Sequence, residues 1–91
     1  MGVTLNGTLT CVTQAEADCV RTALAEHIRL TRAEAGCISF EVLQTADPMV
    51  WSVAECFTDA AAFEAHQARA GASDWARETA GIARDYKIDG L

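Results

Sequence analysis

The sequence predicts a single α+β domain over residues 1–91, and three observations lead to that fold class. Apolar and polar residues alternate near both ends of the chain, as they do in strands with one buried face. A helix-capping motif is followed by a long apolar stripe of helical spacing. Two stretches rich in β-branched and aromatic residues flank a short turn, which indicates a hairpin.

The first strand and the first helix follow from local patterns. Residues 3–12 alternate with a period of two, and TQAE at 13–16 is a capping box that opens a helix. This helix is predicted to end before Gly36, which stands where a left-handed C-terminal residue is needed. The apolar side of the strand carries Val3, Leu5, Leu9 and Cys11, and the helix stripe carries Val20, Leu24, Ile28 and Thr31.

A hairpin is predicted next, because residues 37–44 and 50–57 are both rich in β-forming side chains. The intervening TADP ends the first of these strands, since Pro48 disfavours the helical conformation at Asp47 and marks a turn. The two strands are therefore expected to pair in antiparallel fashion.

The last third of the chain predicts two helices and a strand. Thr58 is expected to cap a helix that runs to about Ala70 and closes at Gly71. Ser73 or Asp74 then opens a short helix to about residue 80, closed by Gly81, and residues 83–89 alternate again. Arg84, Tyr86 and Ile88 share one face of this last strand.

The predicted order, β-α-β-β-α-α-β, is a split βαβ arrangement of the ferredoxin-like type. It has a four-stranded antiparallel sheet with the helices on one face, and the other face of the sheet is left bare. Hydrophobic residues make up 51% of the chain, which is generous for a domain that buries only part of its surface. We therefore expect a homodimer in which two sheets stack face to face.

Composition excludes several classes of function. The net charge of −6 argues against nucleic acids and anionic membranes as partners, because both attract basic surfaces. No apolar run of transmembrane length and no signal-peptide core are present, so we expect a cytoplasmic protein. The chain has no glycine-rich phosphate loop and no clustered metal ligands, so no cofactor and no metal site are expected. Its four cysteines are spaced singly and are expected to be small buried thiols.

Two histidines are candidates for chemistry, since imidazole titrates near neutral pH. His27 lies on the apolar stripe of the first helix, where it is either a hydrogen-bonded core residue or a proton carrier that lines a pocket. His66 lies one turn after Phe63, whose ring should anchor that helix face to the sheet and bring His66 to the buried edge. Spacing alone leaves both a structural and a catalytic role open for His66.

Further candidates lie on the last two strands. Strand parity puts Glu55 among apolar neighbours, and a buried carboxylate needs a partner. Arg84 shares its face with Tyr86 and is one possible partner; a Glu55–Arg84 pair would be structural or would place a fixed charge beside a ligand. Trp51 and Trp75 are expected to belong to the core more than to a ligand platform.

The segments EAGCISFEV (34–42) and WSVAECFTDAAAFEAHQ (51–67) resemble the antibiotic biosynthesis monooxygenase family. The resemblance implies a dimeric α/β barrel built from ferredoxin-like subunits, each with a pocket between its sheet and its own helices. It also implies an enzyme that oxidises a small aromatic or quinol-type substrate with O2 and needs no flavin, haem or metal.

The same resemblance implies roles for individual residues. His66 matches the histidine of an A-H motif and would be the proton acceptor, and Glu55 matches a glutamate of the third strand. Trp75 falls near an aromatic that follows the helix break, and Arg84 resembles an arginine that contacts substrate in the polyketide branch. Asn6 corresponds to a first-strand asparagine of several members. The predicted substrate pocket therefore comprises Asn6, His27, Glu55, Trp75, Arg84 and Tyr86.

The chain also departs from parts of the family. Many quinol-oxidising members carry a second histidine soon after the first, whereas this chain continues as QARAGASDW. The haem-degrading branch needs an axial histidine about one turn beyond the aromatic of the third helix, and that neighbourhood here is ARETAG, so haem degradation is not expected. Two alternatives to a monooxygenase follow: an isomerase or decarboxylase-like enzyme that moves a proton with the same histidine, and a dimer that only binds a small molecule.

Overall fold

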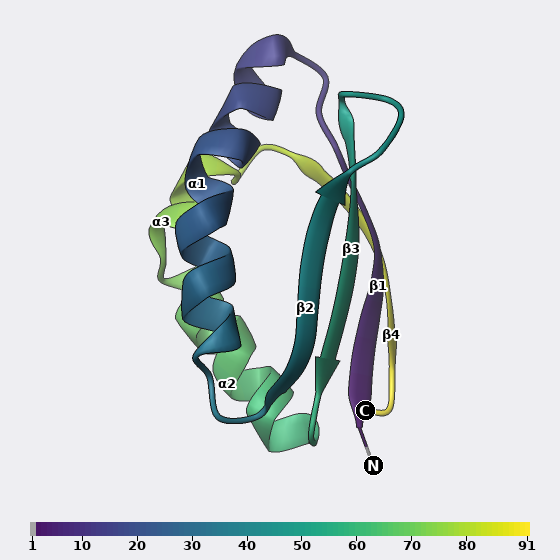
Figure 1. The fold of residues 1–91 in the computed structure, drawn as a ribbon, viewed down its shortest axis with the longest axis vertical. Coiled ribbons are helices and arrows are strands. Elements are labelled where there is room, and N and C mark those ends of the chain that lie inside the picture. Colours follow the sequence, from purple (N-terminus) through teal and green to yellow (C-terminus); the bar gives the residue numbers. More distant parts are fainter. Residues whose placement is uncertain (1) are drawn as a thin grey trace.

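The computed structural model describes residues 2–91 and confirms the α+β fold class. The helices and strands follow one another in the expected order (Figure 1). They are β1 (Val3–Thr10), α1 (Gln14–Arg32), β2 (Cys37–Gln44), β3 (Val50–Phe57), α2 (Ala60–Gly71), α3 (Asp74–Glu78) and β4 (Ala83–Asp89).

The four strands form one antiparallel sheet in the order β2-β3-β1-β4. All three helices lie against one face of this sheet, as Figure 1 shows, so the molecule has two layers. β1 and β3 are the central strands, and β2 and β4 are the edges. A bulge between Cys37 and Ser39 shifts the register at the start of β2. This topology is the ferredoxin-like arrangement that the sequence predicts.

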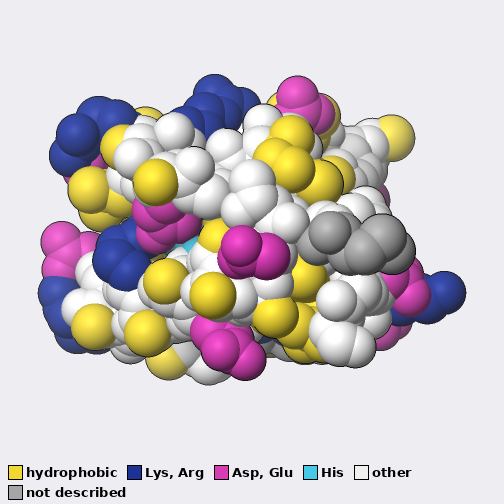
Figure 2. Space-filling model, turned by 90° about the horizontal axis from the view of Figure 1, so that it is seen from below, with side chains coloured by type: hydrophobic (Ala, Val, Ile, Leu, Met, Phe, Trp, Pro, Cys, Tyr) yellow, Lys and Arg dark blue, Asp and Glu magenta, His cyan; other side chains and the backbone are white. Residues whose placement is uncertain are grey.

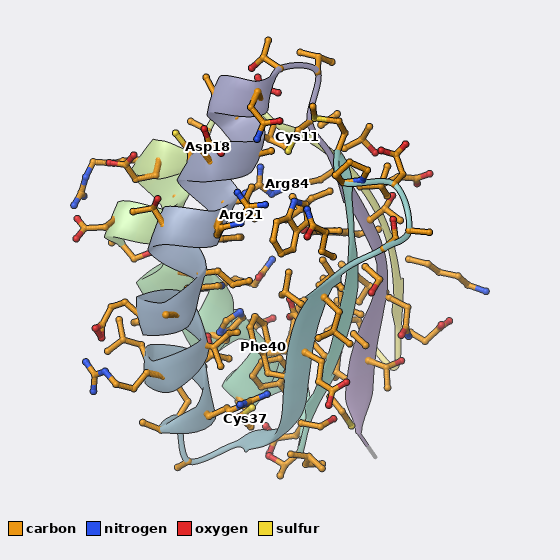
Figure 3. All side chains as sticks on the ribbon, turned by 45° about the horizontal axis from the view of Figure 1, so that its top comes forward. Cys11, Asp18, Arg21, Cys37, Phe40 and Arg84 are labelled. Carbon is orange, nitrogen blue, oxygen red and sulfur yellow. The ribbon has the colours of Figure 1, made fainter. Side chains whose placement is uncertain are left out.

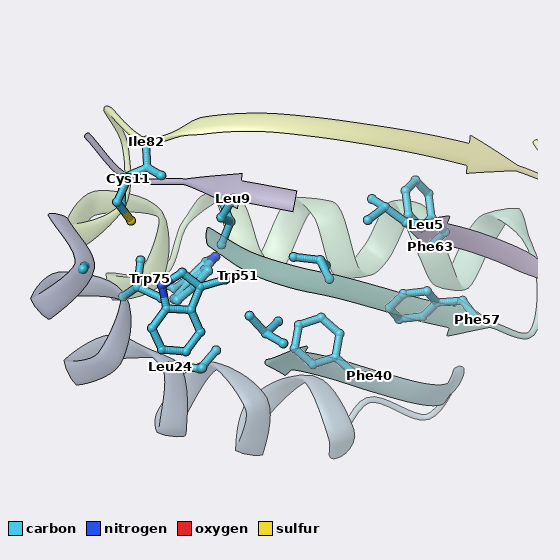
Figure 4. Close-up of a cluster of buried hydrophobic side chains, with 14 of the residues drawn as sticks. Leu5, Leu9, Cys11, Leu24, Phe40, Trp51, Phe57, Phe63, Trp75 and Ile82 are labelled. Atoms are coloured by element: carbon cyan, nitrogen blue, oxygen red, sulfur yellow. The ribbon is translucent and has the colours of Figure 1, made fainter. Parts of the chain in front are cut away.

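The core fills the space between the helix layer and the inner face of the sheet. Alternate residues of each central strand point into it, because successive side chains of a strand lie on opposite faces. Trp51, Trp75 and Leu24 pack at one end, while Leu5, Phe57 and Phe63 pack at the other (Figure 4). Phe57 and Phe63 meet edge to face with ring centroids 5.8 Å apart, which fixes α2 on the sheet.

Helix α1 begins as predicted, but Gly36 does not end it in a left-handed conformation. The Thr13 side chain accepts a hydrogen bond from the Glu16 amide, and α1 ends with Ala33 in a right-handed conformation. Among residues 2–91 the only positive φ belongs to Gly90. Gly36 is needed for a different reason: a Cβ built there would lie 2.2 Å from the Cβ of Ala62 on α2. Only glycine allows the chain to pass α2 this closely.

The cap of α2 is one residue later than predicted. Asp59, and not Thr58, accepts a hydrogen bond from the Ala62 amide at 2.8 Å. The backbone amide of Thr58 instead donates a hydrogen bond to the Gly36 carbonyl. This bond connects the start of α2 to the loop before β2. Ser73 precedes α3, but its hydroxyl donates to the Ala70 carbonyl at the end of α2.

The outer face of the sheet is less apolar than the hydrophobic surplus suggested. Many of the residues counted as hydrophobic are alanines that lie on the helices, so they add nothing to the sheet. The central strands present small neutral side chains on this face. The charged side chains of this face lie on the edge strands β2 and β4. The outward residues of β1 and β3 are Thr4, Asn6, Thr8, Thr10, Ser52, Ala54 and Cys56.

The expectation of four buried thiols is wrong for three of them. Only Cys11 is buried, and the other three are half-buried. Cys56 points to the outer face because its parity on β3 is opposite to that of Glu55 and Phe57. All four thiols are free within the described part of the chain. No helix of residues 2–91 is long and apolar enough to cross a bilayer.

Candidate functional site

A cavity of about 370 Å³ lies between α2, α3 and the β1–β4 side of the sheet; we call it the inner pocket. Small side chains on the helix side leave this space open, since the helices contribute Ala70, Gly71 and Ala76 there. The sheet contributes one residue each from β1 and β3 and two from β4. The other lining residues are Leu5, His27, Glu55, His66, Gln67, Trp75, Ala80, Arg84 and Tyr86.

His66 is held on the buried face of α2 by aromatic neighbours. Its side chain is only 2% exposed, and its ring centroid lies 4.9 Å from that of Phe57 and 5.8 Å from that of Phe40. Phe63, one turn earlier, anchors the same helix face, as the spacing predicted. Figure 3 places Phe40 between the helices and the sheet.

Two carboxylates face the two ring nitrogens of His66. Nδ1 lies 2.8 Å from Glu34 Oε1, which is a hydrogen-bond distance. Nε2 lies 3.7 Å from Glu55 Oε1, which is longer than a hydrogen bond. Burial lowers the pKa of His66, while the hydrogen bond to Glu34 opposes that shift. The net lowering favours a neutral ring, which is the form that accepts a proton.

Glu34 is fixed by a clamp from α2 and α1. Arg69, one turn after His66, donates from Nε to Glu34 Oε2 at 2.8 Å. Its Nη2 donates to the hydroxyl of Thr31 at 2.8 Å, and Thr31 is fully buried on α1. The Glu34 carboxylate is therefore held by Arg69 of α2, which is itself bonded to Thr31 of α1.

Glu55 is a buried carboxyl group whose Oε1 has no hydrogen-bond partner among residues 2–91. Burial, together with the negative charge of Glu34, raises its pKa to about 7. A group with that pKa exists in comparable amounts as carboxylate and carboxylic acid near neutral pH. It can therefore accept or donate a proton beside His66.

The expected pairing of Glu55 with Arg84 is absent from the described residues. The Arg84 guanidinium, which lies on the helix side of the sheet in Figure 3, donates to the carbonyls of Thr79 and Ile82 and to the Thr79 hydroxyl. These acceptors follow the C-terminal end of α3, where a cation is favoured. Arg84 still lines the inner pocket, but its first task is to hold the loop between α3 and β4.

His27 and Trp75 form one wall of the inner pocket. Their rings are parallel with centroids 4.5 Å apart, and both residues are more than nine-tenths buried. Burial and the nearby cations lower the pKa of His27 to about 3. His27 is therefore expected to stay neutral near pH 7, which favours a structural role in the pocket wall over that of a proton carrier.

Tyr86 reaches the inner pocket because a glycine stands opposite it. Gly7 of β1 pairs with Tyr86 of β4, and a Cβ at Gly7 would lie 2.8 Å from the tyrosine ring. Glycine therefore lets this ring cover β1. Burial raises the pKa of the Tyr86 hydroxyl, so it is protonated at neutral pH and is a possible donor to a ligand.

Asn6 does not lie in the inner pocket. It is exposed on the outer face of β1, where it pairs with Ala54 and Lys87, whereas the pocket lies on the inner side. The alternation of β1 indicates this position, and the prediction that Asn6 lines the pocket is wrong for the pocket of its own chain.

Sequence reasoning missed Glu34 and Arg69 as members of the site. Glu34 begins the EAGC segment that carries part of the resemblance, and Arg69 follows His66 by three residues, so both had a local signal. Their contact joins a loop and a helix 35 residues apart, which periodicity does not reveal. No group of three or more acidic, histidine or cysteine side chains suited to a metal ion occurs within residues 2–91.

A trace of histidine surface is visible at the end of the molecule shown in Figure 2, in a hollow between basic and acidic side chains. The rest of this face carries scattered charges and small apolar groups. Access to the buried chemistry is therefore narrow on this side.

Comparison with known proteins gives a family and a set of similar folds. The sequence model of the family described as Antibiotic biosynthesis monooxygenase matches residues 2–78. No curated protein sequence matches the chain.

Three solved structures illustrate the similarity of fold. A protein from Nitrosomonas europaea superposes with a TM-score of 0.80 at 23% identity, covering 100% of this chain and 98% of that one. PA3566 from Pseudomonas aeruginosa has a TM-score of 0.74 at 27% identity, covering 99% and 91%. SnoaB, a cofactor-independent oxygenase from Streptomyces nogalater, has a TM-score of 0.80 at 15% identity, covering 99% and 92%.

Proposed function

The chain belongs to the antibiotic biosynthesis monooxygenase family, and on that premise we propose that it oxidises a small aromatic hydroxy compound with O2 in the inner pocket. His66 is the proton acceptor of this proposed reaction. The substrate class is a quinol or a related electron-rich phenol. No cofactor is part of the proposal, in line with SnoaB, which is a cofactor-independent oxygenase.

The observation that carries the proposal is the pairing of His66 with two carboxyl groups at a cavity. A neutral imidazole, buried and fixed through Nδ1, is suited to take a proton from a hydroxyl group at Nε2. Glu55, beside Nε2, supplies a second group that titrates near neutrality. Titratable groups with such shifts inside a cavity are typical of sites that move protons.

The chemistry then divides between substrate and protein. Removal of the hydroxyl proton by His66 leaves a phenolate, which is electron-rich enough to reduce O2. In the overall reaction one oxygen atom enters the substrate as a carbonyl, replacing two hydrogen atoms, and the other leaves as water. The substrate thereby supplies all four electrons. The protein contributes the proton acceptor, the orientation of the ring and the exclusion of water.

The inner pocket limits the size of the substrate. Its volume of about 370 Å³ lies near the lower end of the range of roughly 300–1,000 Å³ for small-molecule pockets. Its apolar walls come from Leu5, Trp75 and the alanines of α2 and α3, which suit a flat ring. The Tyr86 hydroxyl and the Arg84 guanidinium are the groups suited to an oxygen at the far end of that ring.

Oxygen uptake with a panel of hydroquinones and hydroxynaphthalenes tests the proposal. We expect turnover by the wild-type chain and a loss of roughly 100-fold or more in His66→Gln, because a positioned base contributes that much. Circular dichroism and the melting temperature show whether the variant keeps the fold. If the wild-type chain consumes O2 no faster than buffer over the whole panel, the proposal is wrong.

A non-oxidative reaction is the alternative, because His66 and Glu55 are both suited to moving a proton. The same His66–Glu55 pair would isomerise a substrate by moving a proton between two of its atoms. Product formation in the strict absence of O2 would favour this alternative over a monooxygenase.

We also propose that the chain is a homodimer that pairs through the outer face of the sheet. The central strands present neutral, small side chains there, while Glu41, Asp85, Lys87 and Asp89 lie on the edge strands. A neutral centre with a charged rim is typical of a protein interface.

A further inference from the structure

The contact between Glu34 and His66 suggests a role beyond holding α2 to α1. We propose that Glu34 is a positioning residue that sets the tautomer of His66, keeping the ring proton on Nδ1 so that the lone pair of Nε2 faces the inner pocket. The tautomer itself does not depend on the proposed function; only its importance for the reaction rate rests on that function.

The short contact between Glu34 and His66 determines which ring nitrogen carries the proton. Glu34 Oε1 lies 2.8 Å from Nδ1, and a carboxylate can only accept hydrogen bonds. A hydrogen bond at this distance therefore requires the proton on Nδ1. In a neutral imidazole the other nitrogen, Nε2, is then the acceptor.

Glu55 is a competing carboxyl group beside the other ring nitrogen of His66. Glu55 Oε1 lies 3.7 Å from Nε2 and has no hydrogen-bond partner among the residues described. If Glu34 did not hold the proton at Nδ1, a proton on Nε2 would satisfy Glu55 after a small movement. Nε2 would then be a donor and could not accept a proton from a ligand. The two carboxyl groups compete for one ring proton, and the shorter contact of Glu34 decides the outcome.

Arg69, which is itself bonded to Thr31, holds Glu34 in place. Arg69 donates to Glu34 Oε2 at 2.8 Å, and its other contact is the hydroxyl of Thr31, which is fully buried. Arg69 has only donors, so it requires an oxygen from residue 34. In a glutamine at this position the amide oxygen would face Arg69, and the amide NH2 would face Nδ1. The substitution Glu34→Gln should therefore invert the tautomer and not merely weaken it.

Histidine-selective ¹⁵N labelling with long-range ¹H–¹⁵N correlation spectra tests this directly, because protonated and unprotonated ring nitrogens have well-separated shifts. At a pH where the ring is neutral, we expect His66 of the wild-type chain to carry its proton on Nδ1. In Glu34→Gln we expect the proton on Nε2. In Glu34→Asp, which keeps a carboxylate, we expect the wild-type tautomer.

His27 serves as an internal reference in the same spectra, since it does not contact Glu34 through any hydrogen bond in the described residues. The matched control is Glu64→Gln, the same change at an exposed position of α2, which should leave the His66 spectrum unaltered. A wild-type His66 protonated on Nε2, or a Glu34→Gln spectrum with the proton still on Nδ1, would overturn the proposal. If Glu34→Gln does not fold, the wild-type and Glu34→Asp spectra still decide it.

The kinetic consequence is measured separately, on whichever quinol the wild-type chain oxidises. We expect kcat of Glu34→Gln to fall at least tenfold with KM changed less than threefold, and Glu34→Asp to recover most of the loss. An inverted tautomer with unchanged kcat would overturn the link to catalysis. Absence of turnover by the wild-type chain would overturn the proposed function, and the tautomer assignment would stand on the spectra.

Discussion

Glu55 combines deep burial with a carboxyl group that has no cation beside it in the described structure. Burial and the charge of Glu34 raise its pKa from 4.5 to about 7. The folded state therefore keeps this proton over a pH range in which the unfolded chain has lost it. Stability from this group is complete below the unfolded pKa and is lost as pH rises through the folded pKa.

A glutamine at position 55 should remove that pH dependence. Relative to wild type, Glu55→Gln should gain about 3 kcal/mol in the free energy of unfolding between pH 4.5 and pH 8, because each pKa unit corresponds to about 1.4 kcal/mol. Urea titrations at a fixed protein concentration across this range measure it. Both histidines are present in both proteins, so their contributions to the pH dependence largely cancel in the difference.

The exposed Glu41→Gln is the control for this experiment, and its difference from wild type should vary far less with pH. A flat Glu55→Gln difference would mean that the pKa of Glu55 is the same in the folded and unfolded states. That result would contradict its assignment as a group that titrates beside His66.

At the scale of the elements, the helix layer depends on one close passage. Gly36, between α1 and β2, lies against Ala62 of α2, and an alanine there would place two Cβ atoms 2.2 Å apart. Gly36→Ala should therefore cost about 1–3 kcal/mol, the usual range for overpacking. Thermal or urea unfolding measures this loss.

Gly81→Ala provides a matched control for Gly36→Ala. A Cβ at Gly81 meets nothing within 4 Å, and its φ is not positive. The control should therefore be neutral or stabilised by up to about 1 kcal/mol, because alanine restricts the unfolded chain. Equal effects of the two substitutions would show that the passage at Gly36 is not tight.

The elements themselves follow from the sequence because their signals are local. Period-two alternation and β-forming residues place β2, β3 and β4 at the bounds found in the structure, and Thr13 caps α1 as its motif predicts. The cap of α2 is missed because Thr58 and Asp59 are both capping residues, and only the tertiary bond of the Thr58 amide distinguishes them. The role of Gly36 is missed because it depends on a contact between distant segments.

The candidate site is predictable only in part, for the same reason. The inward parity of Glu55 and the helical spacing of His66 can be read from the sequence, and both residues do line the inner pocket. The partner of each could not be inferred, because Glu34 and Arg69 reach the site across the fold. Three of the five N–H donors of Arg84 are taken by a loop whose path no local pattern specifies.

At the scale of the whole molecule, the two-layer structure leaves one face of the sheet without a helix (Figure 1). Ala54 lies near the middle of that face, on β3, between Asn6 of β1 and Glu41 of β2. If two copies pair through this face, a long cation at Ala54 would be buried at the centre of the interface. An isolated subunit would tolerate the same cation, because the side chain is exposed there and Glu41 is adjacent.

Ala54→Arg should therefore shift the chain from dimer to monomer without unfolding it, as measured by light scattering coupled to size-exclusion chromatography. Burying a long charged side chain at the centre of an interface costs several kcal/mol, which lowers the affinity of the dimer by roughly 100-fold or more. Ala25→Arg makes the same change on the exposed side of α1 and should leave the dimer intact. A wild-type chain that is monomeric at all concentrations, or an Ala54→Arg variant that still dimerises, would rule out pairing through this face. The inner pocket lies on the opposite side of the sheet from Ala54, so Ala54→Arg also separates assembly from any chemistry at His66.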